Sequence, residues 1–385
     1  MDENDKARAG TLPGDPEEGT VPMGADGQPL PQPESLVRID SLFAEALRRA
    51  VARRTEDEKP VPVPWPEFAK QLGGGLWPGL HMLIGGTGVG KSALALQIAL
   101  GAAKAGVPTG YIGLELGDLD IALRVLGEAG DFRWSNLYTG RASEMDFRRA
   151  REAATALAGL PFYRESGRAN GWPASALRAF VERMRLEHPE KTKGSTPVLI
   201  VLDFLQLVGD EFDSTRGRMM GLEMRERISR AAYVAREMAR SDDVTVLAIS
   251  STARTNYGQD KLVKEAGLRM VGKDARRFVA NPDAIVGMGK ESGEIEYSAD
   301  SVNVLLKGPM LDGHDGLEKT MLLVTAKGRA TGESWCALRF EHGHHFRAWP
   351  GGEAEVYEAM NEKTASEKPQ AEPANGVTGK VFDVD

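Results

Sequence analysis

The chain contains one pattern typical of phosphate chemistry, in which glycines precede a lysine and a hydroxyl at the spacing G-x-x-x-x-G-K-[ST]. The residues are Gly85, Gly86, Thr87, Gly88, Val89, Gly90, Lys91 and Ser92. Glycines allow successive backbone N–H groups to point at one anion without a Cβ clash. Lys91 can reach the β- and γ-phosphates of ATP, and the Ser92 hydroxyl can bind Mg²⁺. We therefore predict a site for ATP and Mg²⁺; the alternative is a glycine-rich turn that ends in Gly-Lys-Ser by chance.

Two carboxylates stand at the ends of apolar segments, where they can serve the same site. Asp203 ends a run of apolar residues, 198–202, and a carboxylate at this position can face the metal ion of a phosphate-binding loop. Glu115 follows the apolar segment Thr109–Leu114 and can orient or deprotonate an attacking water. The alternatives are a capping aspartate and a solvated glutamate at the rim of a sheet. We predict that Asp203 and Ser92 are metal ligands and that Glu115 is catalytic.

Predicted strands and helices alternate around these residues. Apolar segments indicate buried strands at His81–Gly85, Thr109–Leu114, Pro197–Asp203 and Val244–Ser250. Helical segments cover Ser92–Lys104 and Gly221–Arg240. This alternation predicts an α/β fold whose mainly parallel sheet is flanked by helices on both faces. Four later segments predict antiparallel strands added at one side of the sheet: Ser301–Lys307, Thr320–Ala326, Ser334–Phe340 and His345–Trp349.

The ends of the chain differ in composition from the middle. Residues 1–34 and 352–385 are acidic and poor in bulky apolar residues, which predicts two disordered tails. Residues 35–59 hold a predicted linker helix, Ser35–Arg54, with one apolar stripe. The segment Pro60–Pro66 alternates proline with apolar residues and predicts a stiff, extended spacer. We assign residues 60–351 to one main domain.

Composition constrains the location and partners of the protein. A single cysteine, Cys336, excludes an intrachain disulfide and fits a reducing compartment. The chain has no long apolar run and no apolar segment near Met1, so we predict a cytoplasmic protein without membrane contact. The net charge is −8, but the tails hold −11 of it and residues 35–351 hold +3. A mildly basic centre permits a nucleic-acid partner without demonstrating one.

Several segments together resemble the motor domain of DnaB-type replicative helicases, over about residues 65–350. They are Gly75-Leu76-Trp77-Pro78-Gly79-Leu80 before the phosphate-binding loop, Leu202-Asp203-Phe204-Leu205-Gln206-Leu207, Glu291–Asp300 with the sequence ESGEIEYSAD, and Lys327-Gly328-Arg329. The resemblance implies a RecA-like ATPase core that uses ATP and Mg²⁺ to move on single-stranded DNA during replication. Rival interpretations are a RadA- or KaiC-like ATPase and a nucleotide-gated DNA-binding or regulatory protein without unwinding activity.

The resemblance also implies a ring, a hexamer in this family. Lys327 and Arg329 would then be catalytic residues that reach the γ-phosphate of a neighbouring subunit. The alternative is a solvated strand end that carries two bases. The helix Ser35–Arg54 would dock on the neighbour, although it could also fold back on its own domain, because an isolated helix cannot bury its stripe alone.

Two loops after predicted strands carry the bases expected to contact DNA phosphates. The expected DNA-binding residues are Arg216 and Arg218 in one loop, and Arg254, Lys261, Lys264, Arg269 and Lys273 in the other. The alternative is a solvated charged surface. Neither loop is rich in aromatic residues, so the sequence gives no indication of base stacking.

The chain departs from the family pattern at several points. Ser251 stands where the family has a glutamine that senses the γ-phosphate, which puts the coupling of hydrolysis to movement in doubt. Only 64 residues precede Trp65, so we expect neither the helical N-terminal domain of the family nor its contact with primase. Three histidines close together, His342, His344 and His345, could bind a metal ion. Because no matching Cys or carboxylate accompanies them, we interpret the segment as a hairpin turn.

Overall fold

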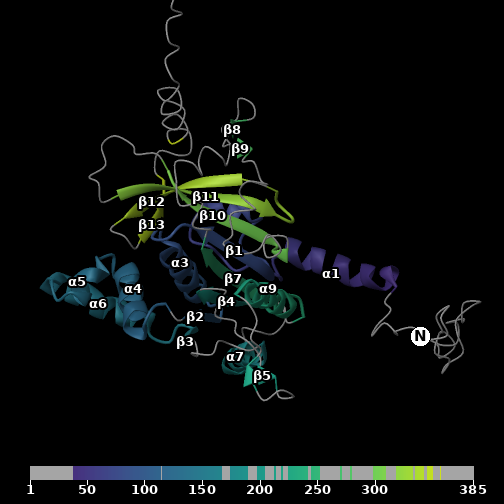
Figure 1. Ribbon diagram of the computed structural model, residues 1–385, viewed down its shortest axis with the longest axis horizontal. Helices are drawn as coiled ribbons and strands as arrows, with labels where there is room; N and C mark the ends of the chain where they lie inside the picture. The colour runs from purple at the N-terminus through teal and green to yellow at the C-terminus, as the bar shows by residue number, and fades with distance from the viewer. Residues whose placement is uncertain are drawn as a thin grey trace, which may run out of the picture. The chain divides into compact units, whose positions relative to one another are not determined.

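Figure 1 shows the computed structural model of the chain. The structure describes residues 38–113, 115–166, 174–189, 197–203, 212–213, 218–219, 224–241, 244–251, 269–270, 278–279, 298–308, 318–332, 334–341, 345–349 and 356. The chain divides into two compact units between Asp57 and Glu58. The predicted tail 1–34 lies outside the described residues. Val356, from the predicted C-terminal tail, is described and is fully buried, and the rest of residues 352–385 lies outside the described part of the chain.

A sheet of nine strands forms the centre of the second unit, in the order β13-β12-β11-β10-β1-β7-β4-β2-β3. The strands are β1 Gly79–Gly85, β2 Thr109–Gly113, β3 Phe162–Ser166, β4 Val198–Asp203, β7 Val244–Ser251, β10 Ser301–Lys307, β11 Glu318–Gly328, β12 Ser334–Glu341 and β13 His345–Ala348. Two short hairpins pair β5 Phe212–Asp213 with β6 Arg218–Met219, and β8 Arg269–Met270 with β9 Phe278–Val279. The predicted α/β fold with a mainly parallel sheet is confirmed.

The parallel part of the sheet is two strands wider than the sequence predicted, because it also contains β3, which pairs in parallel with β2, and β10. β10 was expected to be an antiparallel addition, but it pairs in parallel with β1, with Ser301 opposite His81. The antiparallel addition therefore begins at β11, which pairs with β10 in the opposite direction, and continues through β12 and β13. An apolar strand segment gives no indication of its direction, which is why the prediction was wrong at this strand.

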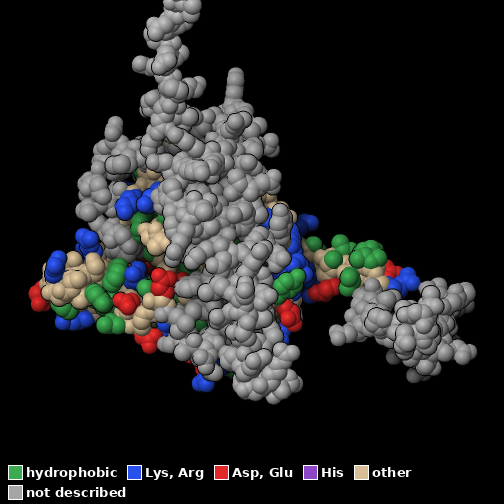
Figure 2. Space-filling model, viewed as in Figure 1, with side chains coloured by type: hydrophobic (Ala, Val, Ile, Leu, Met, Phe, Trp, Pro, Cys, Tyr) green, Lys and Arg blue, Asp and Glu red, His purple; other side chains and the backbone are tan. Residues whose placement is uncertain are grey.

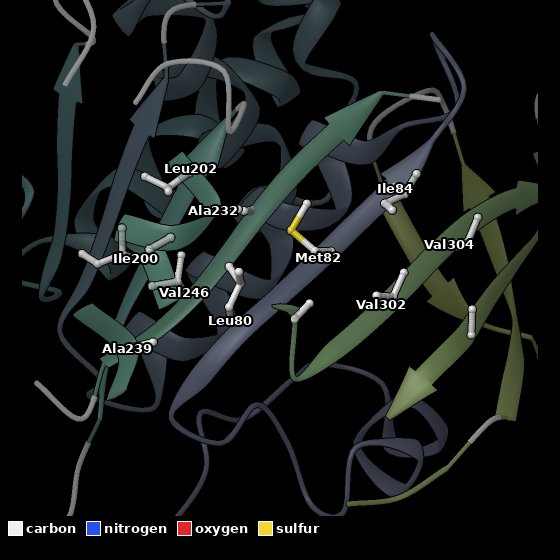
Figure 3. Packing of buried hydrophobic residues seen from close by; sticks show 14 of the residues in the cluster. Leu80, Met82, Ile84, Ile200, Leu202, Ala232, Ala239, Val246, Val302 and Val304 are labelled. Atoms are coloured by element: carbon white, nitrogen blue, oxygen red, sulfur yellow. The ribbon is translucent and has the colours of Figure 1, made fainter. Parts of the chain in front are cut away.

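Helices cover both faces of the sheet. α3, Lys91–Lys104, packs on one face against β1, β2, β4 and β7, while α9, Met224–Ser241, packs on the other against β1 and β7. Because side chains alternate along a strand, Leu83 faces the α3 side and Met82 faces the α9 side. Figure 3 shows the α9 side, where Met82 and its neighbours on four strands meet Ala232 and Ala239.

The Pro-rich segment 60–66 is part of the core and not a free spacer. Val61 forms a two-way backbone hydrogen-bonded bridge with Leu76, at 2.9 Å in each direction. The Trp65 side chain is buried, and its Nε1 donates to the Phe346 carbonyl at 3.1 Å. The alternation of proline with apolar residues therefore serves to place apolar side chains in the core. The short helix α2, Pro66–Gln71, follows directly.

Between residues 116 and 196, the structure contains elements that the sequence did not predict. They are α4 Asp118–Gly130, α5 Trp134–Tyr138, α6 Glu144–Leu157, β3 and α7 Ala174–Glu187. α4 packs against both α5 and α6, and it also contacts α3. A capping box starts α6, because the Ser143 side chain and the Asp146 side chain each accept from the backbone N–H of the other.

The first unit holds the predicted linker helix. It consists of a 3₁₀ turn, Ile39–Leu42, and α1, Phe43–Arg54. Ile39, Phe43, Leu47 and Val51 recur every four residues and are all exposed. Figure 2 shows hydrophobic side chains gathered along α1. Among the described helices, none is both long and apolar enough to cross a bilayer.

Candidate nucleotide-binding site

The predicted phosphate-binding loop lies between the end of β1 and the start of α3. Gly88 and Gly90 have φ values of 74° and 101°, which L side chains rarely adopt. A Cβ added at Gly90 would lie 2.9 Å from Phe346 Cζ and 3.0 Å from Phe340 Cζ, so the loop is seated directly on this stacked aromatic pair. The first N–H groups of α3 face the loop and favour an anion there.

Lys91 begins α3 and turns its ammonium group back into the loop. Its Nζ donates to the carbonyls of Gly85, at 2.9 Å, and Gly86, at 2.8 Å. Burial lowers the pKa of Lys91, whereas the negative charges of Glu115 and Asp203 raise it. The two carboxylates predicted from separate segments therefore lie within electrostatic reach of the same ammonium group.

Asp203 ends β4 directly opposite Gly113 at the end of β2. The residue is only 1% exposed, and burial raises the pKa of its carboxyl group, while Tyr111, Ser92 and Lys91 lower it. Tyr111 donates its phenolic hydrogen to Asp203 Oδ2. The buried Oδ1 has no hydrogen-bond partner among the residues that the structure describes. An unsatisfied carboxylate oxygen beside a serine hydroxyl fits Mg²⁺, which prefers oxygen ligands.

Glu115 lies two residues beyond the end of β2 and is exposed. The loop that carries it is held from β3 by Arg164, whose Nη2 donates to the Leu116 carbonyl at 2.9 Å. Arg164 Nε also lies 3.5 Å from Asp118 Oδ1, at the start of α4. Sequence reasoning missed Arg164, because a single charged residue within a short strand segment gives no indication of what it contacts.

Arg124 on α4 is a second basic residue that sequence reasoning missed. Its guanidinium lies 4.3 Å from the centre of the Trp134 ring. Burial lowers the pKa of Arg124, while Asp120, Tyr111, Asp203 and Glu115 raise it. The group therefore adds positive charge beside both predicted carboxylates of the site. Only the fold brings it there, since a lone arginine on an amphipathic helix is ordinarily solvated.

Lys327 and Arg329 lie at the opposite edge of the sheet. Gly328, between them, pairs with Ser301, which in turn pairs with His81 near the start of β1. The phosphate-binding loop follows the other end of β1. Arg329 is anchored by Asp300, with Nη1 2.9 Å from Oδ1 and its backbone N–H donating to the Asp300 carbonyl at 2.9 Å.

Asp300 also binds the start of β1. Its Oδ2 accepts from the Leu80 N–H at 3.0 Å, and its own N–H donates to the Leu80 carbonyl at 2.7 Å. The exposed fractions of the paired side chains are 45% for Arg329 and 23% for Asp300. The guanidinium is therefore held on one side and accessible to solvent on another.

Ser251 ends β7, and its backbone lies opposite Gly85. The position where the family has glutamine is thus at the loop edge of the sheet. Of the predicted DNA-binding residues, Arg216, Arg254, Lys261, Lys264 and Lys273 lie outside the described residues, and Arg218 and Arg269 are described only as members of β6 and β8. His342 and His344 also lie outside, and no cluster of metal-ligating side chains is found within the part of the chain that is described.

Several known proteins resemble this chain over most of its length. The family model for the DnaB-like helicase C terminal domain matches residues 66–347. Among relatives, the replicative DNA helicase DnaC of Bacillus subtilis (strain 168) is 26% identical over 278 residues, covering 72% of this chain and 53% of the relative. The replicative DNA helicase DnaB of Geobacillus stearothermophilus is 25% identical over 271 residues, covering 70% and 52%. The chain thus spans about half the length of these relatives.

Two solved structures share the fold. One is an isolated ATPase domain, which superposes with a TM-score of 0.61 at 20% identity, covering 82% of this chain and 100% of that one. The other is a DnaB-like replicative helicase, described together with its interactions with primase. It gives a TM-score of 0.59 at 19% identity, covering 80% of this chain and 66% of that one. At these identities the likeness concerns the fold alone.

Proposed function

Because the chain belongs to the family of DnaB-like helicase C-terminal domains, we propose that it is an ATP-hydrolysing, ring-forming motor that acts on single-stranded DNA in replication. One observation carries the proposal. Lys91, Glu115 and Asp203 come from three separate segments and meet at the loop edge of the parallel sheet. Ligands of open α/β sheets bind at this edge, outside the carboxyl ends of the strands.

In the proposed site each residue has a distinct task. The backbone N–H groups of the loop and the start of α3 bind the phosphates, and Lys91 leaves the loop carbonyls to contact the β- and γ-phosphates. Ser92 and Asp203 would hold Mg²⁺, which neutralises charge on the phosphates when it is bound. Glu115, on a loop fixed by Arg164, orients the water that attacks the γ-phosphate.

Lys327 and Arg329 act in this proposal on the nucleotide of a neighbouring subunit. Their position supports such an action, because they lie at the edge of the sheet away from the loop of their own chain. Asp300 fixes one side of the Arg329 guanidinium, which leaves its other donors for a phosphate. An arginine that acts across a subunit boundary in this way stabilises the charge that develops in the transition state.

Self-association through α1 is the second part of the proposal. Its exposed stripe of Ile39, Phe43, Leu47 and Val51 is costly to leave in water, and a helix of this length is marginal alone. A neighbouring copy of the chain would cover the stripe and close a ring, which we expect to be a hexamer. The competing arrangement is a helix folded back on its own domain. Contact with primase is not part of the proposal, and a cytoplasmic location remains a prediction.

A nucleotide-gated DNA-binding protein without unwinding activity is the second candidate, and Ser251 favours it. Ser251 has a shorter side chain than the glutamine of the family pattern, so it would couple the γ-phosphate less well to the DNA-binding loop. ATP hydrolysis measured with and without single-stranded DNA separates the two candidates. The motor predicts several-fold stimulation by DNA, which the Lys91→Ala chain lacks. Turnover that DNA leaves unchanged would overturn the motor and favour the gated binder.

A further inference from the structure

Tyr111 occupies an unusual place for a polar aromatic residue, in the middle of β2 and 0% exposed. Its ring lies in the core on the α3 side of the sheet. The phenolic hydroxyl donates to Oδ2 of Asp203, across the boundary between β2 and β4. A phenylalanine would fill the same apolar space, so packing alone does not account for the hydroxyl.

The register of the two strands explains how the ring reaches the carboxylate. Tyr111 lies opposite Val201, and Gly113, two residues later on the same face, lies opposite Asp203. The ring must therefore lean along β2, over Gly113. A Cβ added at Gly113 would lie 3.3 Å from Asp203 Cβ and 3.5 Å from Tyr111 Cε1. The same Cβ would lie only 2.6 Å from the Asp203 backbone oxygen, so a glycine at this position allows β2 and β4 to approach closely beside the phenol.

The contact distinguishes the two oxygens of Asp203. Oδ2 is occupied by the phenol, whereas the buried Oδ1 has no hydrogen-bond partner within the described part of the chain. A carboxylate held by one oxygen cannot rotate freely, so its second oxygen has a defined direction. Outer partners of metal ligands act in this way throughout metalloproteins.

We propose that Tyr111 is a positioning residue for Mg²⁺: its hydroxyl fixes Oδ2 of Asp203 so that Oδ1 is presented to the metal ion beside Ser92. The inference rests on the proposed nucleotide site and deepens it. Tyr111 itself contacts neither nucleotide nor metal. Loss of such an outer partner typically weakens metal binding by about 10- to 100-fold.

The test compares Tyr111→Phe with Tyr163→Phe in the full chain. Tyr163 lies on the neighbouring strand β3, and its hydroxyl contacts His188 Nε2 at 2.5 Å, so this control removes a hydroxyl bond from the same sheet without touching Asp203. Mn²⁺ binding in the presence of ADP is titrated by electron paramagnetic resonance. Affinity for a fluorescent ADP analogue is measured in EDTA, and melting temperatures are recorded.

We expect Tyr111→Phe to weaken Mn²⁺ binding by about 10-fold while the affinity for metal-free ADP stays within about twofold. Tyr163→Phe should change neither. Equal Mn²⁺ affinity in the wild-type chain and Tyr111→Phe would overturn the inference and leave the nucleotide site standing. Parallel losses of metal and metal-free nucleotide affinity would show a merely structural role and also overturn it. A wild-type chain that binds neither ADP nor Mn²⁺ would overturn both proposals.

Discussion

The position of Arg329 leads to a prediction about mixed oligomers. Its neighbour Gly328 lies two strands from β1, opposite Ser301 and hence level with His81. Gly85 is four residues farther along β1, about 13 Å at the rise of a strand, and two strand spacings add about 10 Å sideways. The resulting separation of roughly 16 Å exceeds the reach of an arginine side chain, about 7 Å. Arg329 therefore cannot serve the loop of its own chain.

The perturbation is a mixture of two inactive chains. Arg329→Ala should lower turnover by about 10³- to 10⁵-fold with nearly unchanged ATP affinity, and Lys91→Ala should abolish nucleotide binding or turnover. In a ring assembled at random from equal amounts, about a quarter of the interfaces join the intact loop of an Arg329→Ala chain to the intact arginine of a Lys91→Ala chain. The mixture should therefore recover up to about a quarter of wild-type turnover.

The assay is steady-state ATP hydrolysis after the two chains have been unfolded together and refolded. A matched control mixes Lys91→Ala with Glu115→Gln, which damage the same half of the site. Every nucleotide site in that mixture lacks either Lys91 or Glu115, so no recovery is expected. If the first mixture recovers no more than the control, although mass measurements show mixed oligomers, the inference that Arg329 acts on a neighbour is refuted.

Three further predictions concern oligomers and stability. Removal of residues 1–57 should lower the oligomer mass seen by light scattering, because α1 carries the exposed stripe; an unchanged mass would exclude its role in assembly. Gly90→Ala should cost about 1–3 kcal/mol in urea unfolding, more than Gly106→Ala, because both glycines have positive φ but only a Cβ at Gly90 would meet other atoms; equal losses would contradict this account. Burial lowers the pKa of His81, so the folded chain holds it neutral. The contribution of neutral His81 to the unfolding free energy should be complete above about pH 6.5. It should fall as the pH drops toward the pKa of the folded state, by at most about 1.4 kcal/mol per pH unit. His81→Gln should reduce this dependence of the unfolding free energy on pH, and an unchanged dependence would exclude His81 as its source.

The sequence predicted those site residues that belong to a pattern of consecutive residues. The phosphate-binding loop and Asp203 each depend on a local pattern, a glycine-rich turn or an apolar run with a polar end. Tyr111 is different, because its partner Asp203 lies 92 positions away and only the pairing of β2 with β4 brings the two together. Arg124 and Arg164 were not predicted either, because only the fold brings them close to the other residues of the site.

The fold shows a similar division. Alternating strand and helix patterns predicted the parallel sheet, because amphipathic periodicity is a local property. The direction of β10 depends on which strand it meets, and its partner β1 lies far earlier in the chain, with His81 opposite Ser301. The segment 60–66 was misread as a spacer because proline signals an extended backbone but not whether the side chains between the prolines are buried.

The fastening of Asp300 to Leu80 has a consequence for communication around a ring. β1 ends in the loop proposed to bind one nucleotide. Near its start, Leu80 is bound by Asp300, which also binds Arg329, the group proposed to act on the next nucleotide. In a ring, β1 would then connect two consecutive nucleotide sites. Any tilt of β1 on phosphate release would move Arg329 near its other end. The order in which the subunits hydrolyse ATP would then depend on β1 as well as on the contacts between subunits.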